Sequence, residues 1–382
     1  MKGNVLMIYF DNAATTAPSS EVCRAVAKGL ECFGNPSSLH KLGLDAEKLL
    51  NNSRDIIASV LSVQPQEIYF TSGATESNNT AIIGAAKKFG KRKKRIVTTS
   101  VEHPSVAEVC MRLESEGFEI IRVSPDANGK INAADIINAV DDNTFLVTCM
   151  YVNNENGFIL PVEKAFSVIK KRYPQVLTHC DCVQAFMKIP VKAKNLNADL
   201  ISLSAHKIHG PKGIGALYVK KGVSIPAFIV GGGQEKSFRS GTESIPLICG
   251  FSEAVKELCG NIDQRFEYVK SLQSYLSERC GQYDNIHVNS DADCSPYVNS
   301  IAVSGLKSEV LLHFLEEREI YVSSGSACSK GKKSSVLQEF KVSEKYLDST
   351  IRISLSKNNT KKEIDILINA LEEADKRLCK IR

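Results

Sequence analysis

The sequence has no apolar run of about 18 residues, the length that a helix needs to cross a bilayer, and this excludes a membrane-spanning helix. It also lacks a strong excess of either charge, since 48 Lys and Arg face 43 Asp and Glu for a formal net charge of +5. Such a mild balance argues against a dedicated nucleic-acid surface. The stretch 1–10 is too short for a signal peptide and has no small-residue cleavage pattern, so we expect a cytoplasmic protein.

Disulfide and metal frameworks are also missing. The 12 cysteines are scattered through a long chain, which favours a reducing cytosol and mostly small, buried thiols. No Cys/His quartet has the spacing of a zinc site, so we expect no metal. A Cys-x-Cys pair, Cys180 and Cys182, could bind metal or act as a redox switch. On a strand, however, both thiols point away from Asp181 toward the face that packs against helices, which favours ordinary core residues.

One basic run, 91–95, stands out from the even charge pattern. It falls between a helix-like segment and a strand-like segment. We interpret it as a solvated loop, and a contact for RNA or an acidic partner is the alternative. We expect no direct nucleic-acid binding.

The chain of 382 residues is long for one hydrophobic core, which predicts two domains. Short β-branched runs alternate with helix-like stretches from about residue 67 to 222, and this order predicts a mainly parallel sheet between helices. After about residue 260, helices and short strands mix, which is typical of a smaller α+β domain. The predicted strands are 67–71, 96–99, 118–123, 145–152, 176–180 and 351–355, and the predicted helices are 78–89, 105–116, 133–140 and 162–172.

Ligands of parallel sheets bind beyond the carboxyl ends of the strands, so the residues that follow each strand matter most. These positions hold an acid, an amine, imidazoles, amides and hydroxyls. Asp181 precedes Lys207 by about a strand and a turn. That order suits pyridoxal phosphate (PLP), because the lysine can hold the cofactor covalently while a buried carboxylate keeps its pyridine nitrogen protonated. The Gly73 turn before the predicted helix could bind the phosphate through exposed N–H groups.

Long ordered motifs support a family assignment. They are 9–16 (YFDNAATT), 34–40 (GNPSSLH), 73–79 (GATESNN), 102–105 (EHPS), 204–207 (SAHK), 210–213 (GPKG), 231–235 (GGGQE), 239–242 (RSGT) and 323–329 (SSGSACS). With these motifs the chain resembles the cysteine desulfurases of the NifS/IscS type, in the class V aminotransferase group of fold-type I PLP enzymes. The resemblance implies a large PLP-binding domain, 13–259, with a seven-stranded type of sheet. It implies a small domain, 1–12 and 260–382, that carries the active-site cysteine loop at about 323–335.

The resemblance also implies roles for single residues. Lys207 would bind PLP, and His103 would stack on the PLP ring and move protons. Asp181 would contact the pyridine nitrogen, and Gln184 would contact the ring hydroxyl. The phosphate would be bound by Ala74, Thr75, Ser204 and His206. Thr242 would reach the phosphate of a neighbouring subunit, which implies an obligate homodimer. Asn154 and Arg352 would hold the substrate carboxylate, a task that suits the two-pronged guanidinium.

Cys328 is the most informative cysteine, because the residues around it are small and polar, as in an exposed loop. The resemblance implies that L-cysteine is converted to L-alanine while Cys328 takes up the sulfur as a persulfide. An acceptor protein for iron–sulfur assembly or for tRNA or cofactor thiolation would then receive it. A selenocysteine lyase or a related PLP-dependent C–S lyase is the alternative, and the loop cysteine favours desulfuration.

One departure from the family pattern follows Arg352. The family commonly has Ser-Leu-Gly-Arg at this point, whereas this chain has Ser-Leu-Ser-Lys at 354–357. Arg352 itself is retained. The change at Ser356 and Lys357 leaves open how the surroundings of the substrate carboxylate are arranged.

Overall fold

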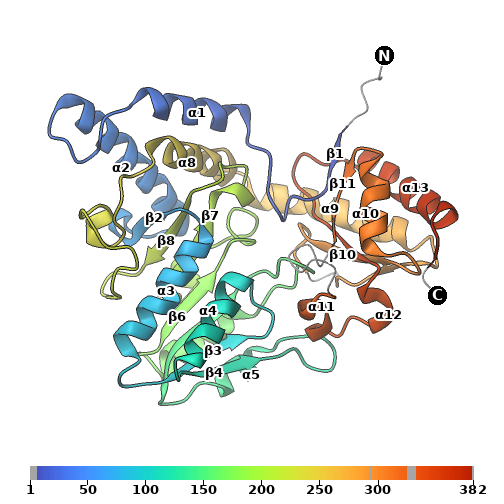
Figure 1. Ribbon diagram of the computed structural model, residues 1–382, viewed down its shortest axis with the longest axis horizontal. Helices are drawn as coiled ribbons and strands as arrows, with labels where there is room; N and C mark the ends of the chain where they lie inside the picture. Colours follow the sequence, from blue (N-terminus) through green and yellow to red (C-terminus); the bar gives the residue numbers. More distant parts are fainter. Residues whose placement is uncertain (1–6, 292–293, 325–332, 381–382) are drawn as a thin grey trace.

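The computed structural model describes residues 7–291, 294–324 and 333–380, arranged as two lobes joined by the long helix α9 (Figure 1). The larger lobe contains a seven-stranded sheet in the order β2-β8-β7-β6-β5-β3-β4. Its strands are β2 (Ile68–Thr71), β3 (Arg95–Thr99), β4 (Glu119–Val123), β5 (Thr144–Met150), β6 (Leu177–Asp181), β7 (Leu200–Ser204) and β8 (Gly215–Val219). Only β8 runs against its neighbours, so the sheet is mainly parallel, as the sequence predicted.

Helices cover both faces of this sheet, which explains why its strands are almost continuously apolar. One face packs against α3 (Ala74–Phe89) and α4 (Pro104–Ser115), as shown by their shared core with Phe145 and Leu200. The opposite face packs against α2 (Lys41–Leu61), α5 (Ala133–Asn138), α6 (Val162–Arg172) and α8 (Ile245–Cys259). The large lobe also contains α1 (Ser20–Glu31), α7 (Ala193–Leu196) and the 3₁₀ turns η1 (Pro65–Glu67), η2 (Ala205–Lys207) and η3 (Glu235–Ser237).

The smaller lobe has its own core, built on an antiparallel sheet in the order β12-β13-β10-β9. These strands are β9 (Ile286–Val288), β10 (Asn299–Val303), β12 (Ser323–Ser324) and β13 (Thr350–Ile353), and the helices are α9 (Ile262–Cys280), α10 (Ser308–Glu316), α11 (Ser335–Glu339), α12 (Glu344–Leu347) and α13 (Lys361–Arg377). A capping box begins α13, since Thr360 and Glu363 cap each other's backbone N–H groups.

Two segments tie the lobes together. The N-terminal strand β1 (Ile8–Tyr9) pairs in parallel with β11 (Ile320–Tyr321) of the small lobe. Conversely, Phe340, which follows α11, belongs to the core of the large lobe and packs on Phe158. We propose that the lobes correspond to domains 13–259 and 1–12 with 260–382.

Several predicted boundaries were wrong by a few residues. The helix predicted at 78–89 begins at Ala74, because the turn at Gly73 leads directly into it. The strand predicted at 67–71 begins at Ile68, because Pro65–Glu67 forms a 3₁₀ turn. The strand predicted at 145–152 ends at Met150, and the chain turns there toward Asn153. No helix in the described ranges is long and apolar enough to cross a membrane.

Candidate active site

Polar side chains collect at the carboxyl edge of the large sheet. Asp181 and Ser204 are the last residues of β6 and β7, and His103 follows β3 as the N-cap of α4. Lys207 lies in the 3₁₀ turn directly after β7. Because these strands are parallel, their ends bring together residues that lie up to about a hundred positions apart in the sequence.

A chain of hydrogen bonds connects Asp181 to His103. Asn78 Nδ2 donates to Asp181 Oδ2 over 2.8 Å and to Ser105 Oγ over 2.8 Å, and Ser105 Oγ lies 2.9 Å from His103 Nδ1. The Val183 N–H also donates to Asp181 Oδ1 over 3.0 Å. Asp181 is 5% exposed. These two donors hold the buried Asp181 side chain in a fixed orientation.

Lys207 and Gln184 meet at the N-terminal segment of the chain. Lys207 Nζ donates to the carbonyls of Ala13 and Ala14 over 2.7 and 2.6 Å, and Gln184 Nε2 donates to the same Ala13 carbonyl over 2.9 Å. Lys188 Nζ donates to Gln184 Oε1 over 2.8 Å. Since an ammonium group can only donate, this contact fixes which end of the Gln184 amide is oxygen and turns its NH₂ group toward Ala13.

The remaining predicted residues lie around the start of α3 and the end of β7. Ala74 and Thr75 open α3, where first-turn N–H groups have no partner within the helix. The backbone is crowded there, since a Cβ on Gly215 would lie 2.8 Å from Gly73 Cα. His206 Nδ1 lies 3.3 Å from Thr15 Oγ1. Thr242 is exposed.

Arg352 projects from β13 between the lobes and is 8% exposed. Its Nη2 forms an ion pair with Asp11 Oδ1 over 2.9 Å, and its Nη1 donates to the Asn154 carbonyl over 2.8 Å. Its buried Nε has no hydrogen-bond partner among the described residues. The structure therefore brings the two predicted carboxylate-binding residues together, and the unpartnered Nε leaves a donor for an anionic ligand.

Burial governs the titration of this site. It lowers the pKa of His103, an effect that the nearby Lys207 charge reinforces and the Asp181 charge opposes. It lowers the pKa of His206 to about 4, with Lys207 acting in the same direction. It raises the pKa of Glu155 to about 6, against a hydrogen bond from Ser334 and the charge of Arg352. A neutral imidazole at His103 can accept a proton, which suits a residue that moves protons.

Glu102 lies directly before His103 and is fully buried. Thr99 Oγ1 donates to its Oε1 over 2.6 Å, and the Met150 N–H lies 3.0 and 2.9 Å from its two oxygens. Burial outweighs these bonds and raises the pKa of Glu102 to about 8. Through its hydrogen bonds to Thr99 and Met150, Glu102 joins the ends of β3 and β5 next to His103.

The raised pKa of Glu102 predicts how the substitution Glu102→Gln changes the stability of the protein. Between the ordinary pKa of 4.5 and about 8, the unfolded chain loses the Glu102 proton while the folded chain keeps it, so the wild type loses stability as the pH rises. Glutamine mimics the protonated acid and removes this loss. We expect the variant to match the wild type near pH 5 and to gain on the order of 2–5 kcal/mol in free energy of unfolding by pH 8. Chemical unfolding across this pH range checks it, with the exposed Glu108→Gln as control, and parallel curves would contradict it.

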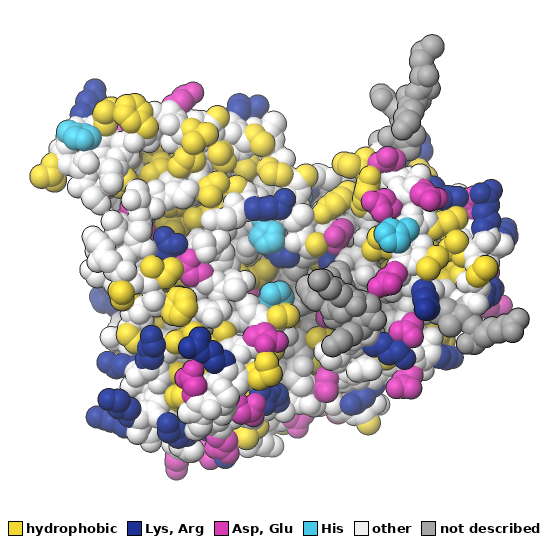
Figure 2. Space-filling model, in the orientation of Figure 1, with side chains coloured by type: hydrophobic (Ala, Val, Ile, Leu, Met, Phe, Trp, Pro, Cys, Tyr) yellow, Lys and Arg dark blue, Asp and Glu magenta, His cyan; other side chains and the backbone are white. Residues whose placement is uncertain are grey.

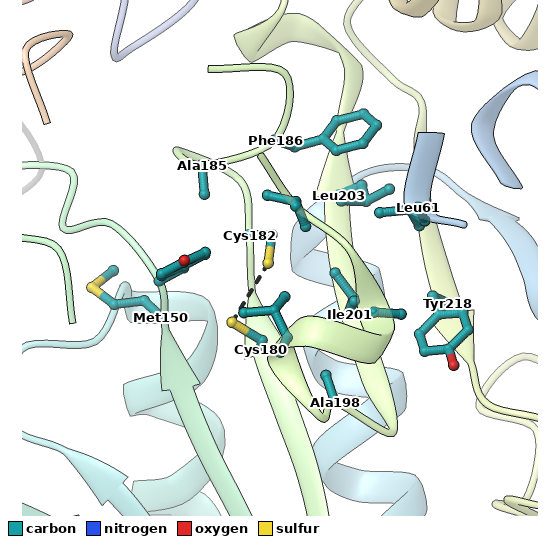
Figure 3. Packing of buried hydrophobic residues seen from close by; sticks show 14 of the residues in the cluster. Leu61, Met150, Cys180, Cys182, Ala185, Phe186, Ala198, Ile201, Leu203 and Tyr218 are labelled. Carbon is teal, nitrogen blue, oxygen red and sulfur yellow. Dashed lines mark hydrogen bonds between the residues drawn. The ribbon is translucent and has the colours of Figure 1, made fainter. Parts of the chain in front are cut away.

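The cysteines and histidines around Asp181 belong to the protein core. Cys180 and Cys182 are fully buried among Leu61, Phe186 and Ile201, with their sulfur atoms 3.5 Å apart, so the prediction of buried thiols is confirmed (Figure 3). His179 lies between Thr148 Oγ1 and Ser202 Oγ, at 2.7 and 2.9 Å. In the described part of the chain, no group of His, Cys, Asp and Glu could hold a metal ion.

The remaining predicted residue, Cys328, lies outside the described residues. Its loop is flanked by Ser324 in β12 and by Ser334, whose Oγ donates to Glu155 Oε2 over 2.5 Å. Glu155 follows Asn154 in the large lobe. The chain therefore re-enters the described structure beside the site.

Sequence analysis missed three residues that shape this site, namely Asn78, Asp11 and Lys188. Asn78 gave one usable signal, since it lies in the motif 73–79 at the start of α3. Asp11 lies in the motif 9–16, but nothing in the sequence links it to Arg352. Lys188 gave no signal, because its contact with Gln184 becomes visible only in the folded chain.

Comparison with known proteins identifies the group to which the chain belongs. The family model described as Aminotransferase class-V matches residues 8–367. The NifS/IcsS protein homolog of Lactobacillus delbrueckii subsp. bulgaricus is 40% identical, over 98% of this chain and 99% of the relative. Cysteine desulfurase IscS of Methanosarcina thermophila is 36% identical, over 97% and 92%.

The solved structure of a NifS-like protein superposes with a TM-score of 0.92 at 36% identity, covering 98% of this chain and all of that one. The likeness therefore extends over both lobes and both sheets. The chain belongs to the class V aminotransferase family, and within it to the proteins of the NifS/IscS type.

Proposed function

We propose that the protein is a PLP-dependent cysteine desulfurase, which forms L-alanine from L-cysteine and passes the sulfur to Cys328. One observation carries the proposal: a buried carboxylate, Asp181, and a primary amine, Lys207, lie at adjoining strand ends of a class V aminotransferase fold. A relative that is 36% identical over nearly the whole chain has the name cysteine desulfurase. The names of the relatives do not favour the alternative of a selenocysteine lyase.

The donor set at the sheet edge fits PLP. A carboxylate, an amine, an imidazole and the N-terminus of α3 match the pyridine nitrogen, aldehyde, ring face and phosphate of that cofactor. Asn78 Oδ1 is buried without a hydrogen-bond partner among the described residues, and Arg352 Nε shares this condition. Polar atoms of this kind are expected where a ligand completes the site.

When bound, PLP supplies an electron sink for the substrate α-carbon. In our proposal, Asp181 holds the proton of the pyridine nitrogen, and Asn78 keeps the carboxylate in place. Gln184 presents its NH₂ group to the ring hydroxyl, and Ala74, Thr75, Ser204 and His206 bind the phosphate. Lys207 and His103 exchange protons with the substrate, and burial keeps His103 neutral and able to accept one.

Arg352 and Asn154 hold the substrate carboxylate in this proposal. Asp11 orients the guanidinium through Nη2 while Nε remains available, so the arginine is positioned before substrate arrives. Its burial between the lobes strengthens its attraction for a carboxylate.

Sulfur transfer then follows a balanced equation. The Cys328 thiolate attacks the substrate sulfur, an S–S bond forms, and the substrate Cβ–S bond breaks with its electron pair left on carbon. Protonation of that carbon gives L-alanine and a persulfide on Cys328. An acceptor protein, for iron–sulfur assembly or for thiolation, would remove the outer sulfur.

We also propose a homodimer. Large apolar side chains are exposed on and between α1 and α2, and they form a yellow area on the upper left of Figure 2. They include Leu30, Phe33, Leu39 and Leu44, of which Leu39 is 93% exposed. An apolar surface of this kind is typical of a subunit interface. In this dimer, the exposed Thr242 would reach the phosphate site of the other subunit. We also propose that the dimer acts in the cytoplasm and binds neither membrane nor nucleic acid.

The test compares L-cysteine turnover in the wild type and in Cys328→Ala with a thiol reductant present. We expect the wild type to form alanine and sulfide in equal amounts and the variant to lose both by about a hundredfold or more. Cys379→Ala, which removes an exposed thiol elsewhere, serves as the control and should retain both products. Alanine formation that survives in Cys328→Ala would refute the role of Cys328. Failure of the PLP-loaded wild type to make alanine would refute the desulfurase assignment.

A further inference from the structure

A cavity of about 30 Å³ lies where the two lobes meet, next to Lys207. Its lining includes Lys188, Lys207, Arg265, Tyr297, Ser356 and Lys357. Of the residues in the proposed cofactor and substrate site, only Lys207 belongs to this lining. The cavity therefore borders the proposed cofactor site at Lys207. About 10–15 Å³ is enough for one water, so the size of the cavity suits a small ion.

The lining of this cavity is strongly cationic. Lys188, Lys207, Arg265 and Lys357 contribute basic side chains, and none of the lining residues is Asp or Glu. Two of the lining residues, Ser356 and Lys357, are the positions where this chain departs from the usual family pattern. A concentration of basic side chains around a small cavity attracts an ion of opposite sign.

Lys188 is the best-buried of these groups. It is 8% exposed, its Nζ donates to Gln184 Oε1, and the same nitrogen lies 5.8 Å from the centre of the Tyr297 ring. The charges that act on it come from Lys207 and Arg352, and within the described ranges no carboxylate contributes. Burial and these two cations lower the pKa of Lys188 to about 7. A buried ammonium group without a counter-ion is costly, and a bound anion would remove much of that cost.

Tyr297 and Arg265 add donors to the same wall. The Tyr297 hydroxyl is buried, and it has no hydrogen-bond partner in the described part of the chain. Arg265 donates through Nη2 to the carbonyls of Met187 and Leu258, and as for Lys188 no described carboxylate acts on it. Since buried polar groups are almost always satisfied, the unpartnered hydroxyl marks a place for a ligand that accepts hydrogen bonds.

We propose that this cavity binds a small monovalent inorganic anion such as chloride, held by Lys188 and the Tyr297 hydroxyl. A volume of about 30 Å³ suits an ion of one or a few atoms. The donors favour an anion over water, because an ammonium group and a hydroxyl both donate to it and its charge offsets the basic lining. The proposal concerns a compartment beside the cofactor site and does not depend on which reaction that site catalyses.

The experiment uses the purified full-length protein as it is isolated. Thermal unfolding is recorded while chloride replaces gluconate at constant sodium concentration, so that ionic strength stays fixed. We expect a saturable rise in the unfolding temperature, because a ligand that binds only the folded state stabilises it. Crystals soaked in bromide should show an anomalous peak within hydrogen-bond distance of Lys188 Nζ and Tyr297 Oη.

Two variants test the two side chains that are proposed to hold the anion. Tyr297→Phe removes one donor to an anion and should weaken apparent chloride affinity about tenfold. Lys188→Met should abolish the chloride response, whereas Lys362→Met, an equal charge change on the exposed side of α13, should leave it unchanged. If Lys188→Met does not fold, the Tyr297→Phe comparison still decides.

Three results would overturn the proposal. The first is equal unfolding temperatures in chloride and gluconate. The second is a chloride response that both Tyr297→Phe and Lys188→Met retain. The third is a bromide peak without a chloride response in solution, which would show an adventitious ion only.

Discussion

Replacing Lys207 with alanine should abolish alanine production from L-cysteine, with a loss of about a thousandfold or more. The lysine combines two tasks in our proposal, since it binds PLP covalently and exchanges protons with the substrate. Its Nζ donates to the carbonyls of Ala13 and Ala14, which hold the amine at the strand end. Alanine produced over time, with the cofactor supplied in excess, is the measurement.

A second readout separates lost chemistry from lost folding. The absorption band of a cofactor bound to lysine should vanish in Lys207→Ala, while circular dichroism stays unchanged. Lys171→Ala, on the exposed end of α6, should retain both the band and the activity. A Lys207→Ala protein that still makes alanine at more than a tenth of the wild-type rate would show that another amine serves the reaction.

The largest stability effect is expected for Arg54→Leu. Arg54 lies in α2 and forms a two-pronged ion pair with Glu235, with N–O distances of 2.8 and 2.6 Å. Both side chains are buried, at 9% and 1% exposure, and the Phe70 N–H also donates to Glu235. Without Arg54 the Glu235 carboxylate remains buried and unpaired, which costs about 3–5 kcal/mol.

The pair also holds a strained turn. Glu235, Lys236 and Ser237 all have positive φ angles, of 46°, 57° and 63°, a conformation that side chains other than glycine disfavour. Chemical unfolding of Arg54→Leu measures the loss of stability. Arg24→Leu is the matched control, because Arg24 pairs with Glu21 at an exposed site and should cost less than about 1 kcal/mol. The double variant R54L/E235Q should recover part of the loss, and equal losses in Arg54→Leu and Arg24→Leu would contradict the argument.

Much of the fold was predictable, because its signals are local. Alternating strands and helices gave the parallel sheet, and the helix 162–172 was predicted with both of its boundaries. The antiparallel course of β8 was not predictable, because nothing in its apolar sequence reveals the direction of the neighbouring strands. Boundaries failed where a turn and a helix share residues, as at Ala74.

The candidate site was likewise predictable only in part. That Lys207, Asp181 and His103 lie together at one edge of the sheet was predictable from their positions after strands and from the motifs around them. The bonds that orient such residues were not, since Asn78 and Asp181 lie 103 positions apart and Asp11 and Arg352 lie 341 apart. Contacts over these separations depend on how whole elements pack, and neither partner carries a local signal for the other.

The pairing of β1 with β11 has a consequence for synthesis on the ribosome. Ile8 pairs with Ile320, so the strand at Ile8 waits for a partner that is translated much later. At about 5–20 residues per second, the intervening roughly 300 residues take on the order of 15–60 seconds to emerge. During that interval the large sheet can form, while the apolar segment at Ile8 and Phe10 has no core to enter. The small lobe therefore assembles after the large sheet, and the apolar segment at Ile8 and Phe10 needs protection until its partner strand has been made.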